Sequence, residues 1–114
     1  MRFEWDEEKN RLNLERHGIS FETAVLVFDD PFAVTDRDVF EKEERWDTLG
    51  SVGLGIVLFV VHTWMEKDGE EMIRIISARA AESRERKTYE EAQPKAETRN
   101  GRPRRKRRRG HRLL

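Results

Sequence analysis

The chain has 114 residues, 36% hydrophobic and 40% charged, which suits one domain with a small core. It contains no cysteine, so disulfides, thiolate metal sites and a cysteine nucleophile are excluded. No apolar segment reaches the roughly 18 residues that span a bilayer. The acidic N-terminus does not resemble a secretory signal. We therefore expect a cytoplasmic protein without a membrane segment.

The net charge of zero conceals two regions of opposite charge. Residues 95–112 hold ten of the 23 basic residues and one of the 23 acids, which leaves 13 bases, 22 acids and a charge of −9 in residues 1–93. We expect residues 94–114 to be a disordered basic tail, because they offer almost no apolar surface to bury. The tail could neutralise phosphates. It could equally fold back loosely on the acidic domain, or be a terminus without a selected role.

The first third of the chain predicts a short strand and two helices. Residues 3–5 are expected to form the strand, and Asp6 is a suitable N-cap for a helix that ends before Gly18. Ser20 can start a second short helix with apolar side chains on one face. Pro31 lies just beyond the end of that helix.

The remainder predicts strands followed by a helix. Strands are expected at 32–35, 44–49, 54–64 and 71–77, with a polar loop or hairpin at 36–42, a turn at Gly50 and a hairpin turn at 67–70. A last helix at 83–93 has Tyr89 as its only large apolar residue, so it should dock weakly or serve a partner. Residues 1–93 therefore predict an α+β fold, a small antiparallel sheet with two N-terminal helices and one C-terminal helix.

Two arginines accompany the last predicted strand. Arg74 lies within it and Arg79 at its exit, where a guanidinium needs an ion-pair partner or a ligand. Strict alternation places them on opposite faces, so they converge only if the strand ends or bulges near Ser77. The simpler alternative for each is a salt bridge to the acidic domain. Glu44 and Arg45 point to opposite faces of their strand. Either could join the arginines across the sheet or remain solvated.

The histidines and the first helix supply the other candidates. His62, in the most apolar strand, is either a hydrogen-bonded core residue or a general base of suitable pKa. Lys9, Asn13 and His17 share one face of the first helix, which could contact RNA or simply be solvated. Three scattered histidines predict no metal site, and no glycine-rich phosphate loop is present, so no cofactor is expected.

Taken together, these residues resemble the BrnT family of toxins over about residues 2–92. The resemblance is carried by Phe3-Glu4-Trp5-Asp6, Lys9, Asn13, His17-Gly18, Ser20-Phe21-Glu22, Asp30-Pro31, Glu44-Arg45, Arg74-Ile75-Ile76-Ser77-Ala78-Arg79-Ala80, Glu85-Arg86 and Tyr89. It implies a RelE-like fold and a metal-independent endoribonuclease that inhibits translation as the toxin of a type II toxin-antitoxin system. It also implies a BrnA-like antitoxin, through which alone the complex would bind DNA.

The resemblance also implies catalytic roles. In RelE-like enzymes the ribose 2′-OH attacks the adjacent phosphate, which requires cations and a group that moves protons. By motif position, Arg79, Arg74 and Arg45 would stabilise the phosphate, and His62 or Glu44 would be the general base. The hypothesis requires guanidinium groups from separate strands to meet in one pocket, and it fails if they point apart, bound by neighbouring carboxylates.

RNA contacts are expected at two further places. Trp5 would stack on a base and Lys9 would contact the backbone. The tail, through Arg104, Arg105 and Lys106, would supply the attraction to RNA that the acidic domain lacks. Two alternative functions remain. One is a catalytically weak or inactive module that binds the antitoxin in a DNA-binding autorepressor complex, and the other is a general nucleic-acid-binding protein that acts through its tail.

Overall fold

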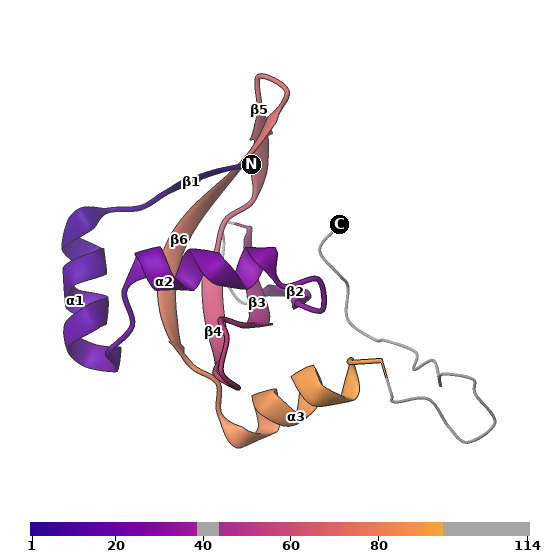
Figure 1. Ribbon diagram of the computed structural model, residues 1–114. Helices are drawn as coiled ribbons and strands as arrows, with labels where there is room; N and C mark the ends of the chain where they lie inside the picture. Colours follow the sequence, from indigo (N-terminus) through magenta and orange to yellow (C-terminus); the bar gives the residue numbers. More distant parts are fainter. Residues whose placement is uncertain (39–43, 95–114) are drawn as a thin grey trace, which may run out of the picture.

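The structure is a computed structural model that describes residues 1–38 and 44–94. In chain order its elements are β1 (Arg2–Glu4), α1 (Glu7–His17), α2 (Phe21–Ala24), the 3-10 helix η1 (Val25–Asp29), β2 (Val34–Asp38), β3 (Arg45–Ser51), β4 (Val57–His62), β5 (Met65–Lys67), β6 (Glu70–Ala80) and α3 (Ser83–Glu91) (Figure 1). The predicted α+β class is confirmed. None of the helices in these two ranges is long and apolar enough to cross a membrane. The expectation of a disordered tail concerns residues outside the described ranges.

The described strands form one mixed sheet in the order β1-β6-β4-β3-β2, with β5 also paired to β6. The predicted antiparallel pairing is confirmed for β2 to β6, whereas β1 at one edge runs parallel to β6. The direction of β1 follows from the position of α1, the next element in the chain, which packs against β6. Its Asn13 side chain donates to the carbonyl of Ala78 at 2.8 Å and accepts from the Ala78 N–H at 3.2 Å.

The predicted helix boundaries in the N-terminal third are confirmed at their capping residues. The Asp6 carboxylate accepts the first free N–H groups of α1, and Gly18 ends the helix in the left-handed conformation with φ 73°. The Ser20 hydroxyl accepts the N–H of Thr23 at 3.1 Å and starts α2. The second helix tightens into η1 after one turn, so it is shorter as an α-helix than its sequence predicts.

Gly50 lies inside β3, so the prediction of a turn at this residue is wrong. A Cβ atom at this position would lie 2.7 Å from the Cβ of Val27 and 3.0 Å from its carbonyl oxygen. Glycine is required here because η1 packs directly on the strand. The turn comes later, and Leu54, which the sequence assigns to the next strand, is 98% exposed within it. The strand itself begins at Val57.

The two faces of the sheet differ in what covers them. We call the face under α1, α2 and η1 the helix face, and Figure 1 shows α2 and η1 crossing it over β6 and β4. The core on this face consists of Phe21, Ala24, Val27, Leu58, Val60, Ile73, Ile75 and Ala78. We call the opposite side the open face. It is covered at one end by α3, through a second cluster of Leu49, Val57 and Tyr89.

Tyr89 fixes α3 to the rest of the domain. Its ring is buried, and its hydroxyl donates to Asp30 Oδ2 at 2.5 Å. The same oxygen accepts the backbone N–H of Ser51 at 2.8 Å. Burial and the bond to Asp30 raise the pKa of Tyr89 above its ordinary value. The carboxylate that follows η1 therefore joins that helix to both β3 and α3.

Candidate functional site

A β-bulge brings Arg74 and Arg79 to the same face of β6. Val61 of β4 pairs with Ser77, but the next residue, His62, pairs with Ile75, so one residue of β6 is inserted in the pairing. The side-chain alternation shifts there, and both arginines lie on the open face. The bulge near Ser77 that the sequence analysis required is present.

The two arginines nevertheless do not share one pocket. They are five residues apart on an extended strand, roughly 15 Å along the chain. Arg74 binds Glu4 of β1, with Nη1 3.1 Å from Oε2, and its side chain is 46% exposed. The predicted pocket with three guanidinium groups is therefore not formed, and the catalytic hypothesis fails for Arg74. Arg74 lies at the far end of the open face from Arg79.

Arg79 is held in a defined orientation by α3. Its two terminal nitrogens donate to the two oxygens of Glu85 at 2.8 and 2.9 Å. Its guanidinium also lies 4.3 Å from the centre of the Phe59 ring. The hydrogen bonds from Arg79 lower the pKa of Glu85, and those to Glu85 raise the pKa of Arg79. The result is a permanently charged, immobilised guanidinium at the rim of the open face.

Arg45 and Asp47 extend this charged region across the sheet. They are two residues apart on β3, so their side chains share a face. Pairing places Asp47 beside Val61 of β4, and Arg79 beside Phe59 of the same strand. On the other side, β2 contributes Asp36 opposite Asp47 and Asp38 opposite Arg45. We call this group the open-face site, formed by Asp36, Asp38, Arg45, Asp47, Arg79 and Glu85.

Asp47 has the most perturbed carboxyl of the open-face site. Burial is the main cause that raises its pKa to about 6, and the nearby carboxylates Asp36, Asp38 and Glu85 add to it. Arg79 acts in the opposite direction. Asp47 is not among the residues that the sequence predicts for the site. The available signal was its i+2 spacing from Arg45, which fixes a common face once the strand is assigned.

His62 lies on the helix face and is completely buried. Its Nε2 lies 2.8 Å from Thr48 Oγ1, which in turn lies 2.8 Å from Thr35 Oγ1. Its Nδ1 lies 2.9 Å from the carbonyl oxygen of Thr63, so a neutral ring with Nδ1 protonated satisfies the chain of bonds. Burial lowers the pKa of His62 to about 4. The core interpretation fits, and the expectation that His62 is a general base does not, because the ring cannot reach a substrate.

Glu44 is also separated from the open-face site. Its carboxylate binds Arg37 at 2.8 Å in an ion pair whose side chains are 52% and 60% exposed. The Arg37 guanidinium lies 5.8 Å from the Trp46 ring, and both residues point to the opposite face from Asp47. The geometry therefore does not support Glu44 as the general base.

The candidate RNA contacts on α1 separate into solvated and structural residues. Lys9 and His17 are exposed, whereas Asn13 is buried and bonded to the backbone of β6. The ring of Trp5 packs edge-on against Phe21 with 6.0 Å between centroids, so one side of it is occupied. These residues lie outside the open-face site. The tail residues Arg104, Arg105 and Lys106 lie outside the described ranges.

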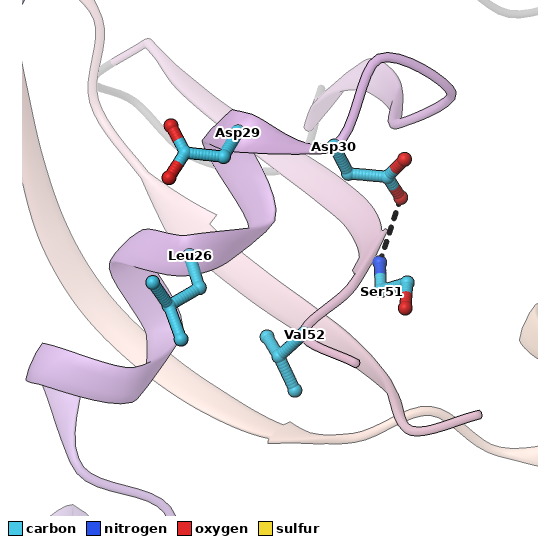
Figure 2. A pocket seen from close by; sticks show the side chains of 5 residues that line it. All are labelled: Leu26, Asp29, Asp30, Ser51 and Val52. Atoms are coloured by element: carbon cyan, nitrogen blue, oxygen red, sulfur yellow. Dashed lines mark hydrogen bonds between the residues drawn. The ribbon is translucent and has the colours of Figure 1, made fainter. Parts of the chain in front are cut away.

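A pocket lies near α3, at the junction of η1 with the end of β3. It is lined by Leu26, Asp29, Asp30, Ser51 and Val52. Figure 2 shows Leu26 and Val52 on its apolar side and the bond from the Ser51 N–H to Asp30. It contains none of the predicted catalytic or RNA-binding residues, although Asp30 belongs to the Asp30-Pro31 pair that carries the family resemblance. Across residues 1–38 and 44–94, no group of three or more His, Cys, Asp or Glu residues is arranged to hold a metal ion.

Fold and site together define a class: a small α+β domain with arginines and carboxylates from several strands on one sheet face, which among the described elements only α3 covers, at one end. The fold resembles the crystal structure of the Brucella abortus ribonuclease toxin BrnT, with a TM-score of 0.52 and 22% identity over 73% of this chain and 99% of the other. A comparison with curated proteins gives no significant match.

The sequence model of one family, described as "Ribonuclease toxin, BrnT, of type II toxin-antitoxin system", matches residues 5–85. The chain belongs to this BrnT family. The predicted family is therefore confirmed, and membership implies an RNA substrate and an antitoxin partner. The matched range includes Arg45, Asp47, Arg79 and Glu85 of the open-face site, and ends early in α3.

Proposed function

We propose that the chain is a metal-independent endoribonuclease toxin that cleaves RNA on its open face. The observation that carries this is the placement of Arg45 and Arg79, from β3 and β6, on the open face in a member of a ribonuclease toxin family. Guanidinium groups bind phosphate oxygens strongly and stabilise the charge that develops in phosphoryl transfer.

In this proposal the ribose 2′-OH attacks the adjacent phosphate, and Arg79 binds the phosphate oxygens. A guanidinium carries five N–H donors. Hydrogen bonds to Glu85 and to the carbonyl of Ala80 occupy three of them, which leaves the Nε–H and one terminal N–H for a phosphate. Because Glu85 already fixes the side chain, little conformational entropy is lost when the phosphate binds. Arg45 adds a second cation on the same face, from β3.

Other cations contribute to binding rather than to the reaction. Arg74, at the far end of the open face, contacts a neighbouring phosphate after exchanging its exposed ion pair with Glu4. Lys9 contacts the RNA backbone from α1, and the free side of Trp5 stacks on a base. The basic tail, with Arg104 among its cations, restores the attraction that the acidic domain lacks. Deletion of residues 95–114 should then weaken RNA binding and reduce its salt dependence.

The proposed partner is a BrnA-like antitoxin in the cytoplasm. An acidic antitoxin segment would occupy the phosphate positions beside Arg45 and Arg79, which would block cleavage directly. In this arrangement the toxin approaches DNA only through the antitoxin.

A second candidate function is a catalytically weak module that acts within an autorepressor complex. It is favoured by the ion pairs of Arg74 with Glu4 and of Arg79 with Glu85, which partly neutralise both guanidinium groups. The charge of −9 on residues 1–93 also opposes RNA binding at long range.

Expression in cells separates the two functions. Induction of the unsubstituted chain should arrest growth, and Arg79→Ala should relieve the arrest at the same protein level. The matched control is Arg86→Ala, since Arg86 is an arginine of the adjacent helix α3 that contacts the carbonyl of Gly55 and the carboxylate of Glu90. This control should remain toxic. Normal growth with the unsubstituted chain, together with intact RNA, would support the second candidate function instead.

A further inference from the structure

We infer that Asp47 is the group that accepts the proton of the attacking ribose 2′-OH. This inference rests on the proposed ribonuclease function, and it adds a residue that neither the motif resemblance nor the family description identifies. It is carried by the place of the carboxylate on the open face, where Asp47 is two residues from Arg45 on β3 and close enough to Arg79 for its charge to act on it.

The position of Asp47 follows from strand pairing. Arg45 and Asp47 lie roughly 7 Å apart between Cα atoms on the same face of β3. From the other side, Arg79 reaches over Phe59 of β4 and acts electrostatically on Asp47. In the proposal, a phosphate bound by Arg79 lies on the same face of the sheet as this carboxylate. The attacking 2′-OH belongs to the same nucleotide linkage and is directed toward Asp47.

The other carboxylates near the open face are less suited to accept a proton. Glu85 binds Arg79 with both oxygens and also accepts the N–H of Glu82 at 2.8 Å, which makes it a weak base. Asp36 lies on an outer strand of the described sheet and is exposed. Of the two bases expected from the sequence, His62 is buried on the helix face and Glu44 is bound to Arg37.

The environment of Asp47 also makes its carboxylate basic enough to accept a proton from the 2′-OH. The charged groups that face it are Asp36 and Asp38 from β2, Arg45 from β3, Arg79 from β6 and Glu85 from α3. Burial and the three carboxylates raise the pKa of Asp47 to about 6 despite Arg79. The group is therefore mostly ionised at neutral pH but is a stronger base than an ordinary aspartate. A general base works best in this range.

The proposed step balances without any added reactant. The 2′-oxygen gives its proton to Asp47 and forms a bond to phosphorus, while the bond from phosphorus to the 5′-oxygen breaks. The products are a 2′,3′-cyclic phosphate and a 5′-hydroxyl. The leaving 5′-oxygen takes a proton from solvent water, and Asp47 returns the proton it accepted to the solvent.

The test is the pH dependence of RNA cleavage by the purified full chain on an RNA oligonucleotide. The unsubstituted chain should show kcat/KM rising about tenfold per pH unit below about 6 and levelling above it. Asp47→Asn should lower kcat on the order of 100-fold or more, remove this rising limb, and leave binding of the uncleavable 2′-deoxy oligonucleotide within about threefold.

Asp36→Asn is the matched control on the adjacent strand. It should keep a rising limb but move it to lower pH, because it removes a charge that raises the pKa of Asp47. If the unsubstituted chain cleaves no RNA, the proposed function fails. If it cleaves RNA and Asp47→Asn keeps both the rate and the limb, only the role of Asp47 is overturned. Should Asp47→Asn not fold, the unsubstituted chain still decides, since a profile without a limb near pH 6 contradicts the inference.

Discussion

The helix face and the open face are built from the same strands but hold their polar groups in opposite ways. On the helix face, Thr35, Thr48 and His62 are fully buried and satisfy one another by hydrogen bonds. On the open face, Asp47 and Arg79 are partly exposed and surrounded by charge. Burial perturbs the pKa on both faces, lowering that of His62 and raising that of Asp47. Access to solvent, rather than the size of the shift, distinguishes a structural group from a reactive one.

Two substitutions on β4 should give the largest difference between the faces. Leu58 is fully buried on the helix face, so Leu58→Ala should lower the free energy of unfolding by about 2–5 kcal/mol. Val61 points to the open face and is only half-buried, so Val61→Ala should cost roughly 1 kcal/mol or less. Urea denaturation measures both values. Equal losses in the free energy of unfolding would contradict this prediction, because they would show that Leu58 and Val61 are buried alike.

The pH dependence of stability should expose the buried histidine. The pKa of His62 is about 4 in the folded chain and near 6.5 when unfolded, so the unfolded state binds more protons between these values. The stabilisation associated with neutral His62 is therefore lost as the pH falls through this window, by about 3 kcal/mol at most. Asp47 acts with the opposite sign, because its raised folded pKa favours folding on acidification.

The measurement should therefore be made in an Asp47→Asn background. Denaturation at pH 7 and pH 4.5 gives the loss in the free energy of unfolding on acidification. This loss should be smaller when His62→Gln is added to Asp47→Asn than in Asp47→Asn alone. An identical loss in both proteins would mean that His62 titrates normally and is not sealed in the core.

Two residues on the same face of α1, Asn13 and Lys9, should have different roles, one structural and one in RNA binding. Asn13 makes three hydrogen bonds to the backbones of Ile19 and Ala78, so Asn13→Ala should cost about 1–3 kcal/mol of stability. Lys9 is exposed, so Lys9→Ala should leave stability unchanged and weaken only RNA binding. Thermal unfolding measures the first effect and filter binding the second. Loss of RNA binding with full stability in Asn13→Ala would favour the alternative that Asn13 faces the RNA.

Local signals predicted the parts of the fold that depend on neighbouring residues in sequence. The caps at Asp6, Gly18 and Ser20 are confirmed, as is the hairpin turn at 67–70. In the C-terminal part, the helix with Tyr89 is confirmed, but its docking through Asp30 joins residues 59 positions apart and could not be read from the chain.

Features that depend on contacts between distant elements could not be predicted, because the sequence shows only which residues are neighbours along the chain. Gly50 was assigned to a turn because the approach of Val27 to it is a tertiary contact. The bulge that brings Arg74 and Arg79 to one face arises from the pairing of β4 with β6, and the sequence established only that it was necessary. Asp47 was overlooked because its burial and its neighbours Asp36 and Asp38 come from the assembled sheet.

The most direct test of the central claim compares RNA cleavage by Arg79→Ala and Glu85→Gln in purified protein of equal stability. Glu85→Gln removes the ion pair but keeps the guanidinium, so it should retain cleavage within about tenfold, while Arg79→Ala should lose on the order of 100–1,000-fold in kcat. Equal losses in the two variants would contradict the account, because Arg79 would then serve only to hold α3 on the sheet.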